Sequence, residues 1–500
     1  MAKTVAQLFE GIECTILGNA DDEVAGLAYR SDKVSPGDAF FCIVGLKADG
    51  HSFAQDAINH GAKVIVAERK VYLADATDVT EVVVSDTRKA MAQVAANYYD
   101  HPSKDFDLVG ITGTNGKTTT TYLVEHIASR AGKRTGVIGT VGIVVAGNKQ
   151  HAEHTTPESS DLQGIFADMR DARVDVVAME VSSHALDLLR TWGTTFAVTA
   201  FTNLTQDHLD YHHTFEAYFE AKARLFSADY PAKRVISIDD KWGKELLRRC
   251  SAADDNIISV GFDPAAQIHP VSVDYEPTHT TVELDVRGSH VKFDYPLVGR
   301  FNVSNVMTAF AIGLQLGFSR EGIVAALEEA PQVPGRLERI STAHTGGVSV
   351  FVDYAHTPDA LQKALHSIQH ITKGRTIVVF GCGGDRDATK RSIMGRASLA
   401  ADYVVVTSDN PRTEDPMAII DDIVSGMGEG SDHYEVQPDR RLAIACAIAH
   451  ANPGDSILIA GKGHEDYQLV GDKVLSFDDR VVAAEELERA FDGSATQTEE

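Results

Sequence analysis

The segment GTNGKTT, residues 113–119, has the composition and spacing of a phosphate-binding loop. Gly113 and Gly116 allow the backbone to turn tightly and to bring its N–H groups close to an anion. Lys117 follows at once and can reach the outer phosphates of a nucleotide, and the hydroxyl of Thr118 can bind Mg²⁺. We predict that this loop binds a nucleotide. The alternative is an ordinary strand–turn–helix with a surface lysine.

The elements around this loop fit that prediction. Residues 106–112 form an apolar run with strand character, and the segment after Gly116 is compatible with a helix that ends at Gly132. A strand, a glycine-rich turn and a helix N-terminus direct several backbone N–H groups to one point. The loop departs from the standard motif at Ile111, where glycine is usual.

A carboxylate and an imidazole follow two later strands. Glu180 ends the apolar run at 174–180, so its carboxylate should emerge at the carboxyl edge of the sheet, where α/β proteins bind ligands. His208 follows the next strand, within TNLTQDHLDYH. Beside Thr118, both are potential Mg²⁺ ligands. The alternatives are a solvated strand end and an ordinary loop histidine, and spacing alone does not decide between them.

Lys222 lies in FEAYFEAKARLF, a helical pattern in which acidic residues precede the lysine. This spacing alone favours a solvent-facing lysine on a helix surface.

Three polar loops follow apolar strands in the last third of the chain. They are GCGGDRDATKR (381–391), SDNPRTEDP (408–416) and AGKGHEDYQ (460–468). Arg386, Arg412 and Glu465 give them charges of both signs, which suits a small zwitterionic ligand. The alternative is three ordinary turns between strands and helices.

The order of predicted elements indicates an α/β protein with three domains, at 1–102, 103–334 and 335–500. Near-continuous apolar runs alternate with helical patterns in the second domain, which predicts a doubly wound parallel sheet. A β-rich interval (255–300) and then an amphipathic helical stretch (302–327) follow it. The predicted strands lie at 38–44, 63–68, 81–85, 136–141, 174–180, 196–203, 234–238, 348–354, 375–381, 402–408 and 456–461.

Composition narrows the class of protein. A net charge of −26 argues against a general nucleic-acid or anionic-membrane binder. No apolar run approaches the ~20 residues that span a bilayer, so we expect a soluble, intracellular protein. The five cysteines are scattered, with no pair at metal-ligand spacing, as in a reduced cytosolic protein; they are Cys14, Cys42, Cys250, Cys382 and Cys446.

Taken together, these segments resemble the Mur ligase family, in the order typical of the family and over nearly the whole chain. The matching segments are GTNGKTT (113–119), MEVSSHAL (179–186), TNLTQDHLDYH (202–212), the lysine of EAYFEAKARLF, GRFNVSN (299–305), PGRLE (334–338) and DYAHTPDAL (353–361). Three further segments are similar to the members that add meso-2,6-diaminopimelate; they are TTPES (155–159), DNPR (409–412) and GKGHEDYQ (461–468).

The resemblance implies an N-terminal domain for the UDP end of a substrate, a central P-loop-type ATPase domain and a Rossmann-like C-terminal domain. The implied ATP contacts are Gly113, Thr114, Asn115, Gly116, Lys117, Thr118, Thr119, Asn302, Arg336 and Asp353. The implied Mg²⁺ ligands are Thr118, Glu180, His208 and Lys222, the last as an N6-carboxylysine (carbamate). Because of this match, we favour a functional Lys222 over a lysine that only faces solvent.

The resemblance also assigns the other substrates. The implied contacts to the UDP-muramoyl-peptide are Ser31, Thr155, Thr156, Ser182 and Arg190. The implied contacts to diaminopimelate are Arg386, Asp409, Asn410, Pro411, Arg412, Gly461 and Glu465.

The implied reaction is ATP-driven amide formation through an acyl phosphate. It joins meso-2,6-diaminopimelate to UDP-N-acetylmuramoyl-L-alanyl-D-glutamate in peptidoglycan precursor synthesis, in a cytoplasmic monomer that binds no nucleic acid and no membrane. Within the family, the alternatives are the same step with L-lysine and the related step that adds a dipeptide. Outside it, they are a P-loop ATPase or kinase without ligation and a non-catalytic UDP-sugar or nucleotide-binding protein.

Overall fold

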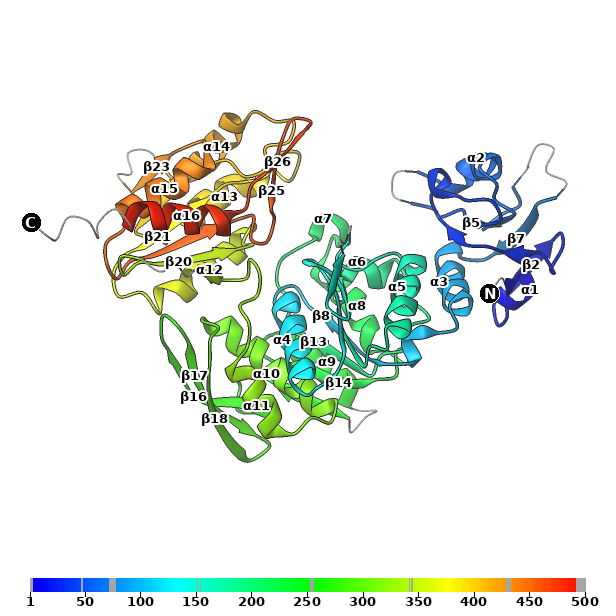
Figure 1. Cartoon of the computed structure of the whole chain (residues 1–500), viewed down its shortest axis with the longest axis horizontal. Coiled ribbons are helices and arrows are strands. Elements are labelled where there is room, and N and C mark those ends of the chain that lie inside the picture. Colours follow the sequence, from blue (N-terminus) through cyan, green and yellow to red (C-terminus); the bar gives the residue numbers. More distant parts are fainter. Residues whose placement is uncertain are drawn as a thin grey trace, which may run out of the picture. The chain divides into compact units, whose positions relative to one another are not determined.

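The structure is a computed structural model that describes residues 3–45, 48–71, 78–150, 152, 154–251, 256–340, 342, 345–428 and 433–491 (Figure 1). The chain forms two compact units, one of Met1–Asp263 with Thr308–Ile323 and the other of Pro264–Met307 with Val324–Glu500. The three domain boundaries stay a prediction. No helix among the described residues is long and apolar enough to cross a membrane.

The first unit begins with a small sheet of strand order β2-β7-β6-β5-β4, parallel except for β2. Three of its strands were predicted, and apolar side chains cover both of its faces. The bounds are β2 Cys14–Leu17, β4 Leu27–Ala28, β5 Ala39–Phe41, β6 Val64–Ala67, β7 Thr80–Val84, α2 Ala54–Asn59 and α3 Thr87–Tyr98.

A larger sheet follows in the same unit, with the order β11-β10-β9-β12-β8-β13-β14-β15. The neighbours in the order β9-β12-β8-β13-β14-β15 pair in parallel, whereas β10 and β11 are antiparallel. The bounds are β8 Asp107–Thr112, β9 Thr135–Gly139, β10 Gly142–Val145, β11 Asn148–Gln150, β12 Val176–Glu180, β13 Val198–Phe201, β14 Lys233–Ser237 and β15 Ile257–Val260. The predicted doubly wound sheet is confirmed.

Strand β8 is the point where the strand order reverses. It lies between β12 and β13, so the loops after these three strands end at one edge of the sheet. This is the usual place for a ligand in an open α/β sheet. The helices of this part are α4 Lys117–Arg130, α5 Ser159–Asp171, α6 Ser183–Asp187, α7 Leu209–His212, α8 Phe215–Ala223 and α9 Lys241–Ser251.

The predicted β-rich interval contains the antiparallel strands β16 Ile268–Tyr275, β17 Thr280–Val286 and β18 Ser289–Tyr295. The helical stretch predicted after it is helical and is divided into two helices, α10 Arg300–Gln315 and α11 Arg320–Glu328. Gly317 ends the first with a φ of 88°, and Phe318 N donates to Gly313 O. A glycine in this left-handed conformation is a common helix terminator.

The second unit contains a sheet of order β19-β20-β24-β21-β22-β23, parallel except for β19. Helices α12, α13 and α14 cover one face and α15 and α16 the other (Figure 1), as two separate apolar clusters show. The bounds are β19 Glu338–Ile340, β20 Ser349–Asp353, β21 Thr376–Phe380, β22 Tyr403–Val406, β23 Tyr434–Val436, β24 Ser456–Ala460, α12 Pro358–Gln369, α13 Thr389–Ser398, α14 Pro416–Val424, α15 Arg440–His450 and α16 Asp479–Phe491.

Candidate active site

The phosphate loop joins β8 to α4 and has the backbone that its glycines predict. Gly113 and Gly116 have φ angles of 148° and 87°. A Cβ on Gly113 would lie 1.9 Å from Thr202 Oγ1, so only glycine fits there. The first turn of α4, which begins at Lys117, directs its N–H groups into the same turn.

Asn203, in the loop after β13, holds the phosphate loop from the side. Thr114 N donates to Asn203 O over 2.9 Å, and Asn115 N donates to Asn203 Oδ1 over 3.0 Å. The hydroxyls of Thr114 and Tyr218 are 3.1 Å apart. Thr114 and Asn115 therefore fix the loop in this structure, and their contact with ATP stays a prediction. Asn203 was not predicted, although it lies in the TNLTQDHLDYH segment.

Two lysines approach one carbonyl group of this loop. Lys117 Nζ donates to Gly113 O over 3.0 Å and to Thr114 O over 2.8 Å. Lys222 Nζ, from α8, donates to Gly113 O over 2.8 Å. Two ammonium groups at one oxygen repel each other, which favours a neutral amine on one lysine or an anion between them.

Lys222 is 1% exposed, so the interpretation as a solvent-facing lysine is wrong. Its Nζ lies 4.6 Å from the centre of the Tyr218 ring. Burial lowers the pKa of Lys222 well below its usual value, and the charge of Lys117 lowers this pKa further. A lysine of this kind holds a neutral, nucleophilic amine more readily than an exposed one does.

Glu180 is a buried carboxylate beside the phosphate loop, and not a solvated strand end, because it is 1% exposed. Thr118 Oγ1 donates to its Oε2 over 3.0 Å. Thr140, which was not predicted, donates its hydroxyl to Oε2 and its N–H to Oε1, over 3.2 and 2.8 Å. Within the described residues, no ion pair balances this carboxylate. A buried carboxylate next to a hydroxyl is a donor set of hard oxygens that fits Mg²⁺.

His208 lies in the loop after β13 with a φ of 52°. Its Nε2 lies 3.3 Å from Asp207 Oδ2, and its ring packs edge-on against His184. Burial lowers the pKa of His208, and the charges of Lys117 and Lys222 lower this pKa further. The neutral imidazole that results is the form that binds a metal ion.

Three of the residues assigned to the muramoyl-peptide adjoin Glu180. Thr156 Oγ1 donates to Glu180 O over 2.9 Å, and Ser182 N donates to Thr156 Oγ1 over 3.1 Å. The hydroxyls of Thr155 and Thr140 are 3.1 Å apart. The phosphate loop and the TTPES segment therefore meet at a single acidic residue.

Arg190, the fourth of these residues, donates to Thr156 O over 2.9 Å and pairs with Glu158 over 2.9 Å. Glu158 also pairs with Arg88 of α3, over 3.3 Å. Neither Glu158 nor Arg88 was predicted, although Glu158 belongs to TTPES. Ser31 makes none of these hydrogen bonds within the described residues, and its assignment to the UDP end stays a prediction.

The remaining residues assigned to ATP lie in the second unit. The Arg336 guanidinium lies 4.7 Å from the centre of the Tyr354 ring. Asp353, at the end of β20, accepts a hydrogen bond from Gly461 N at its carbonyl group, and burial raises the pKa of its carboxyl group to about 6. Asn302 is 1% exposed in the first turn of α10.

The DNPR and GKGHEDYQ loops form one hydrogen-bonded group. Asn410 Nδ2 donates to Glu465 Oε2 over 2.9 Å. Lys462 Nζ lies 3.1 Å from Glu465 Oε2 and donates to Asn410 Oδ1 over 3.3 Å. A Cβ on Gly461 would lie 2.5 Å from Asp409 Oδ2, so glycine allows this close approach. Lys462 was not predicted as a site residue. It is 0% exposed, but nothing in the local sequence indicates that it is buried.

Arg412 is fixed over the loop that contains Arg386. Its Nη1 donates to Gly384 O over 2.7 Å, and a Cβ on Gly384 would lie 1.9 Å from Pro411 O. Arg386 is exposed and donates only to the adjacent Asp385 O, over 3.4 Å, within the described residues. The structure therefore positions Arg412 firmly and Arg386 loosely.

Arg440 holds the two strand ends that precede these loops. Arg440 and Asp479 are both 0% exposed and form two hydrogen bonds of 2.7 Å. The same guanidinium donates to Ser408 O over 3.3 Å and to Ala460 O over 3.1 Å. Sequence reasoning missed this residue, because nothing local distinguishes a buried arginine at the start of a helix from an exposed one.

Lys in place of Arg440 is expected to lower the free energy of unfolding by about 1–3 kcal/mol. A lysine keeps the charge opposite Asp479 but has no planar fork with which to reach Ser408 O and Ala460 O together. Urea denaturation followed by circular dichroism measures the change. Lys in place of Arg248, an exposed arginine that pairs with Glu245 on the surface of α9, is the matched control and should change stability by less than about 1 kcal/mol.

Comparison with known protein families gives three matches along the chain. Residues 23–99 match the Mur ligase family catalytic domain, residues 111–313 the Mur ligase middle domain and residues 335–463 the Mur ligase glutamate ligase domain.

Two relatives are UDP-N-acetylmuramoyl-L-alanyl-D-glutamate–2,6-diaminopimelate ligases. The protein of Clostridium botulinum is 42% identical over 480 residues, which cover 96% of this chain and 98% of the relative. The protein of Gloeobacter violaceus is 45% identical over 471 residues, which cover 94% and 95%.

Solved structures agree with these matches. A structure of a UDP-N-acetylmuramoyl-L-alanyl-D-glutamate–2,6-diaminopimelate ligase aligns with a TM-score of 0.71 at 31% identity, over 98% of this chain and 99% of that one. The D-alanyl-D-alanyl-adding ligase of Acinetobacter baumannii has the same fold, with a TM-score of 0.63 at 19% identity over 93% and 96%. On this full-length similarity and the three domain matches, the chain belongs to the Mur ligase family.

Proposed function

We propose that this protein is an ATP-dependent ligase that joins meso-2,6-diaminopimelate to UDP-N-acetylmuramoyl-L-alanyl-D-glutamate. The names of relatives at 42–45% identity over nearly the full length support this reaction. The solved ligase of the same name is 31% identical, whereas the ligase that adds a dipeptide is only 19% identical, which favours the diaminopimelate step. The reaction belongs to peptidoglycan precursor synthesis, and we expect it to take place in the cytoplasm in a monomer.

The observation that carries this proposal is the position of Glu180. The hydroxyl of Thr118 binds its carboxylate, and the hydroxyl of Thr156 binds its backbone carbonyl group. The segment assigned to the ATP phosphates and the segment assigned to the peptide thus both contact Glu180. Transfer of a phosphoryl group to a peptide carboxylate requires such alignment of the two reactants.

The side chains of this site have separate tasks. Lys117 and the first turn of α4 hold the ATP phosphates, and Arg190 with Ser182 orients the peptide so that its carboxylate attacks the γ-phosphoryl group. The products of this step are an acyl phosphate and ADP. The amine of diaminopimelate then attacks the acyl carbon, and inorganic phosphate leaves as the amide forms. The protein contributes alignment and charge neutralisation, and no side-chain nucleophile is required.

Thr118, Glu180, His208 and a carbamate on Lys222 are the residues proposed to hold Mg²⁺. When bound, Mg²⁺ supplies positive charge to the phosphate oxygens. The buried carboxylate, the neutral imidazole and the buried amine on the phosphate loop all suit this task. Asn302, Arg336 and Asp353 are proposed to contact the rest of the nucleotide, and Ser31 the UDP end.

Phosphate release tests the function. With ATP and Mg²⁺ present, we expect release only when both UDP-N-acetylmuramoyl-L-alanyl-D-glutamate and meso-diaminopimelate are added. Release with ATP alone would indicate an ATPase, and nucleotide binding without any release would indicate a binding protein. Either result would overturn the proposal.

Alanine in place of Lys117 is expected to lower the rate of phosphate release by about 10²-fold, because one charged contact to the transferred group is lost while the loop amides remain. The fold should persist, since Lys117 is at the start of α4, where the loop and not the core surrounds its side chain. Lys133→Ala, at an exposed position after α4, is the control and should keep the parent rate. A Lys117→Ala rate within threefold of the parent would contradict the assignment.

A further inference from the structure

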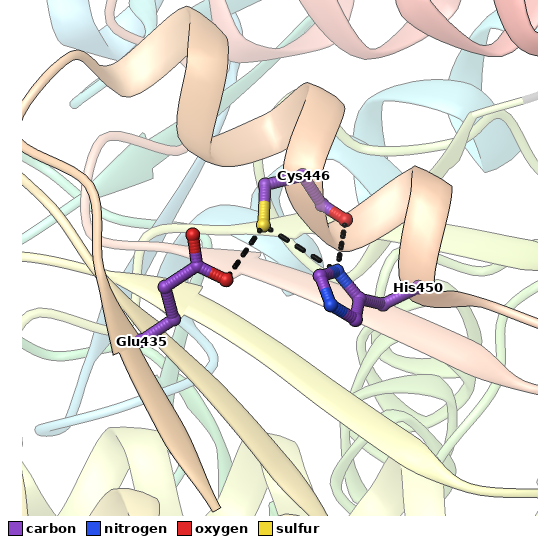
Figure 2. A group of neighbouring side chains, drawn as sticks. All are labelled: Glu435, Cys446 and His450. Atoms are coloured by element: carbon purple, nitrogen blue, oxygen red, sulfur yellow. Dashed lines mark hydrogen bonds between the residues drawn. The ribbon is translucent and has the colours of Figure 1, made fainter.

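Three side chains of different chemistry meet at the edge of the second unit's sheet (Figure 2). Cys446 and His450 lie on α15, and Glu435 lies on the edge strand β23. Their ligand atoms all lie within 4.8 Å of one another. Over the described part of the chain, this is the only group of three or more such residues that meets this spacing.

Two of the distances between these atoms are in the range of a metal coordination sphere. Cys446 Sγ lies 3.2 Å from Glu435 Oε2 and 3.4 Å from His450 Nδ1. In tetrahedral Zn²⁺ sites, with Zn–S of about 2.3 Å and Zn–N or Zn–O of about 2.0 Å, neighbouring ligand atoms are about 3.3–3.5 Å apart. The two pairs that contain Cys446 Sγ therefore already lie at about the separation of ligands on one ion.

We propose that Glu435, Cys446 and His450 bind one Zn²⁺, with a fourth position open to water. A thiolate, an imidazole and a carboxylate are the donors that Zn²⁺ takes, whereas the thiolate disfavours Mg²⁺. On binding, the Zn–S bond replaces the S–H bond of Cys446, and the proton passes to water. None of these residues is assigned to ATP or to either substrate, so this proposal is independent of the proposed function.

The fold positions all three ligands. Residues four apart on a helix lie on the same face, which directs Cys446 and His450 to the same side of α15. Tyr403 supports the other side of the site, because its hydroxyl donates to Glu435 Oε2 over 3.1 Å and its ring stacks on that of His450 at 4.9 Å. Such outer partners orient metal ligands. His450 is exposed and gives the ion a path from solvent.

The side chains of this group already form hydrogen bonds without an ion, and this limits the affinity for Zn²⁺. In the structure the Cys446 thiol donates to Glu435, and His450 Nδ1 lies 2.9 Å from Cys446 O. Zn²⁺ must replace both hydrogen bonds, so we expect reversible binding and not a permanent structural ion. Sequence reasoning missed the site because the cysteines are scattered, and the relevant spacing is one cysteine and one histidine four residues apart.

A Co²⁺ titration of the untagged full-length protein tests the proposal. Metals are first removed and excess Mg²⁺ is then restored, which occupies sites made of oxygen ligands. We expect one equivalent of Co²⁺ to give a thiolate-to-Co²⁺ charge-transfer band, and Zn²⁺ to displace it. The band reports a metal–sulfur bond, and none of the residues proposed to hold Mg²⁺ is a cysteine.

Two variants probe the site and two serve as controls. Cys446→Ser should abolish the band, and His450→Ala should weaken Zn²⁺ binding by at least about 10–100-fold. Cys14→Ser removes another partly exposed thiol, and His290→Ala removes a histidine that faces Glu283 and Asp285 but no cysteine. Both controls should bind Zn²⁺ as the parent does.

Absence of the band in the parent protein, or an unchanged band in Cys446→Ser, would overturn the proposal. The proposal would also be overturned if Cys14→Ser lost the band while Cys446→Ser and His450→Ala kept it. If Cys446→Ser does not fold, His450→Ala decides alone, because its side chain is exposed. Zn²⁺ should also raise the melting temperature of the parent protein but not that of His450→Ala.

Discussion

Alanine in place of Lys222 is expected to lower the rate of phosphate release by about 10³-fold. Lys222 is 1% exposed, and its Nζ bonds to Gly113 O beside Lys117. As a carbamate, Lys222 would carry a negative charge, and the repulsion between two ammonium groups at Gly113 O would be removed. If this proposal holds, the variant removes that anion and one of the proposed Mg²⁺ ligands.

Short carboxylates test the chemical form of Lys222. Acetate or propionate should restore part of the activity of Lys222→Ala by supplying the missing anion in the space that the side chain leaves. Lys222→Arg should stay inactive under the same conditions, because the guanidinium neither accepts CO₂ nor leaves that space. Circular dichroism of both variants separates the loss of an anion from the loss of the fold.

Carbon-13 NMR of protein in labelled bicarbonate provides a direct measurement. The parent protein should give a carbamate signal that is absent from Lys222→Ala and retained in Lys244→Ala. Lys244 is an exposed lysine paired with Asp263, so its amine stays protonated and serves as the control. A parent protein that is fully active without a carbamate signal would contradict the prediction.

The sequence predicted the α/β class and the parallel strands well, because these strands are short buried apolar runs with clear ends. It predicted less of the short and edge strands. β11 and β23 consist of exposed or partly buried residues and lack a continuous apolar run. β23 pairs with β22, which is remote in sequence, so the local pattern does not define it. β10 is apolar but short, and it follows β9 through a tight turn that the predicted strand at 136–141 ran into.

The candidate site shows the same limit. Thr118 and Glu180 were predicted to approach each other because both follow strands of one sheet, and the structure places them in contact. Local spacing favoured a solvent-facing Lys222, and only the packing of α8 on the phosphate loop buries it. Lys462 and Arg440 were missed for the same reason, since their burial depends on contacts across the fold. Charged residues are seldom buried, so local patterns favour the exposed alternative.

Alanine in place of Arg412 is expected to lower kcat/KM for meso-diaminopimelate by about 30- to 4,000-fold. The bond from Nη1 to Gly384 O fixes the guanidinium. Within the described residues, its Nε and Nη2 groups have no hydrogen-bond partner, so they remain available for a carboxylate. We propose that the distal carboxylate of diaminopimelate binds this guanidinium; L-lysine has no such carboxylate.

Glu465 is the second residue that we expect to act in the selection of meso-diaminopimelate over L-lysine. Burial raises the pKa of Glu465, although Lys462 acts against this shift, and Asn410 also donates to its carboxylate. These two bonds fix the position of the carboxylate, which we propose binds the distal ammonium of the substrate. L-Lysine satisfies Glu465 but leaves Arg412 without an anion, and an unpaired buried charge costs about 2–5 kcal/mol.

The assay compares meso-diaminopimelate and L-lysine for the parent protein, for Arg412→Ala and for Arg441→Ala. Arg441 lies on α15 and pairs with Glu485 and Glu486 of α16, outside the loops assigned to the substrates, so Arg441→Ala should keep the parent values. Arg412→Ala should leave KM for ATP within about threefold, because the lost contact is specific to the amino acid. Arg412→Ala need not gain activity with L-lysine, since removal of the guanidinium creates no new contact to that substrate. A parent protein that used L-lysine as well as meso-diaminopimelate would show that Arg412 does not select the substrate.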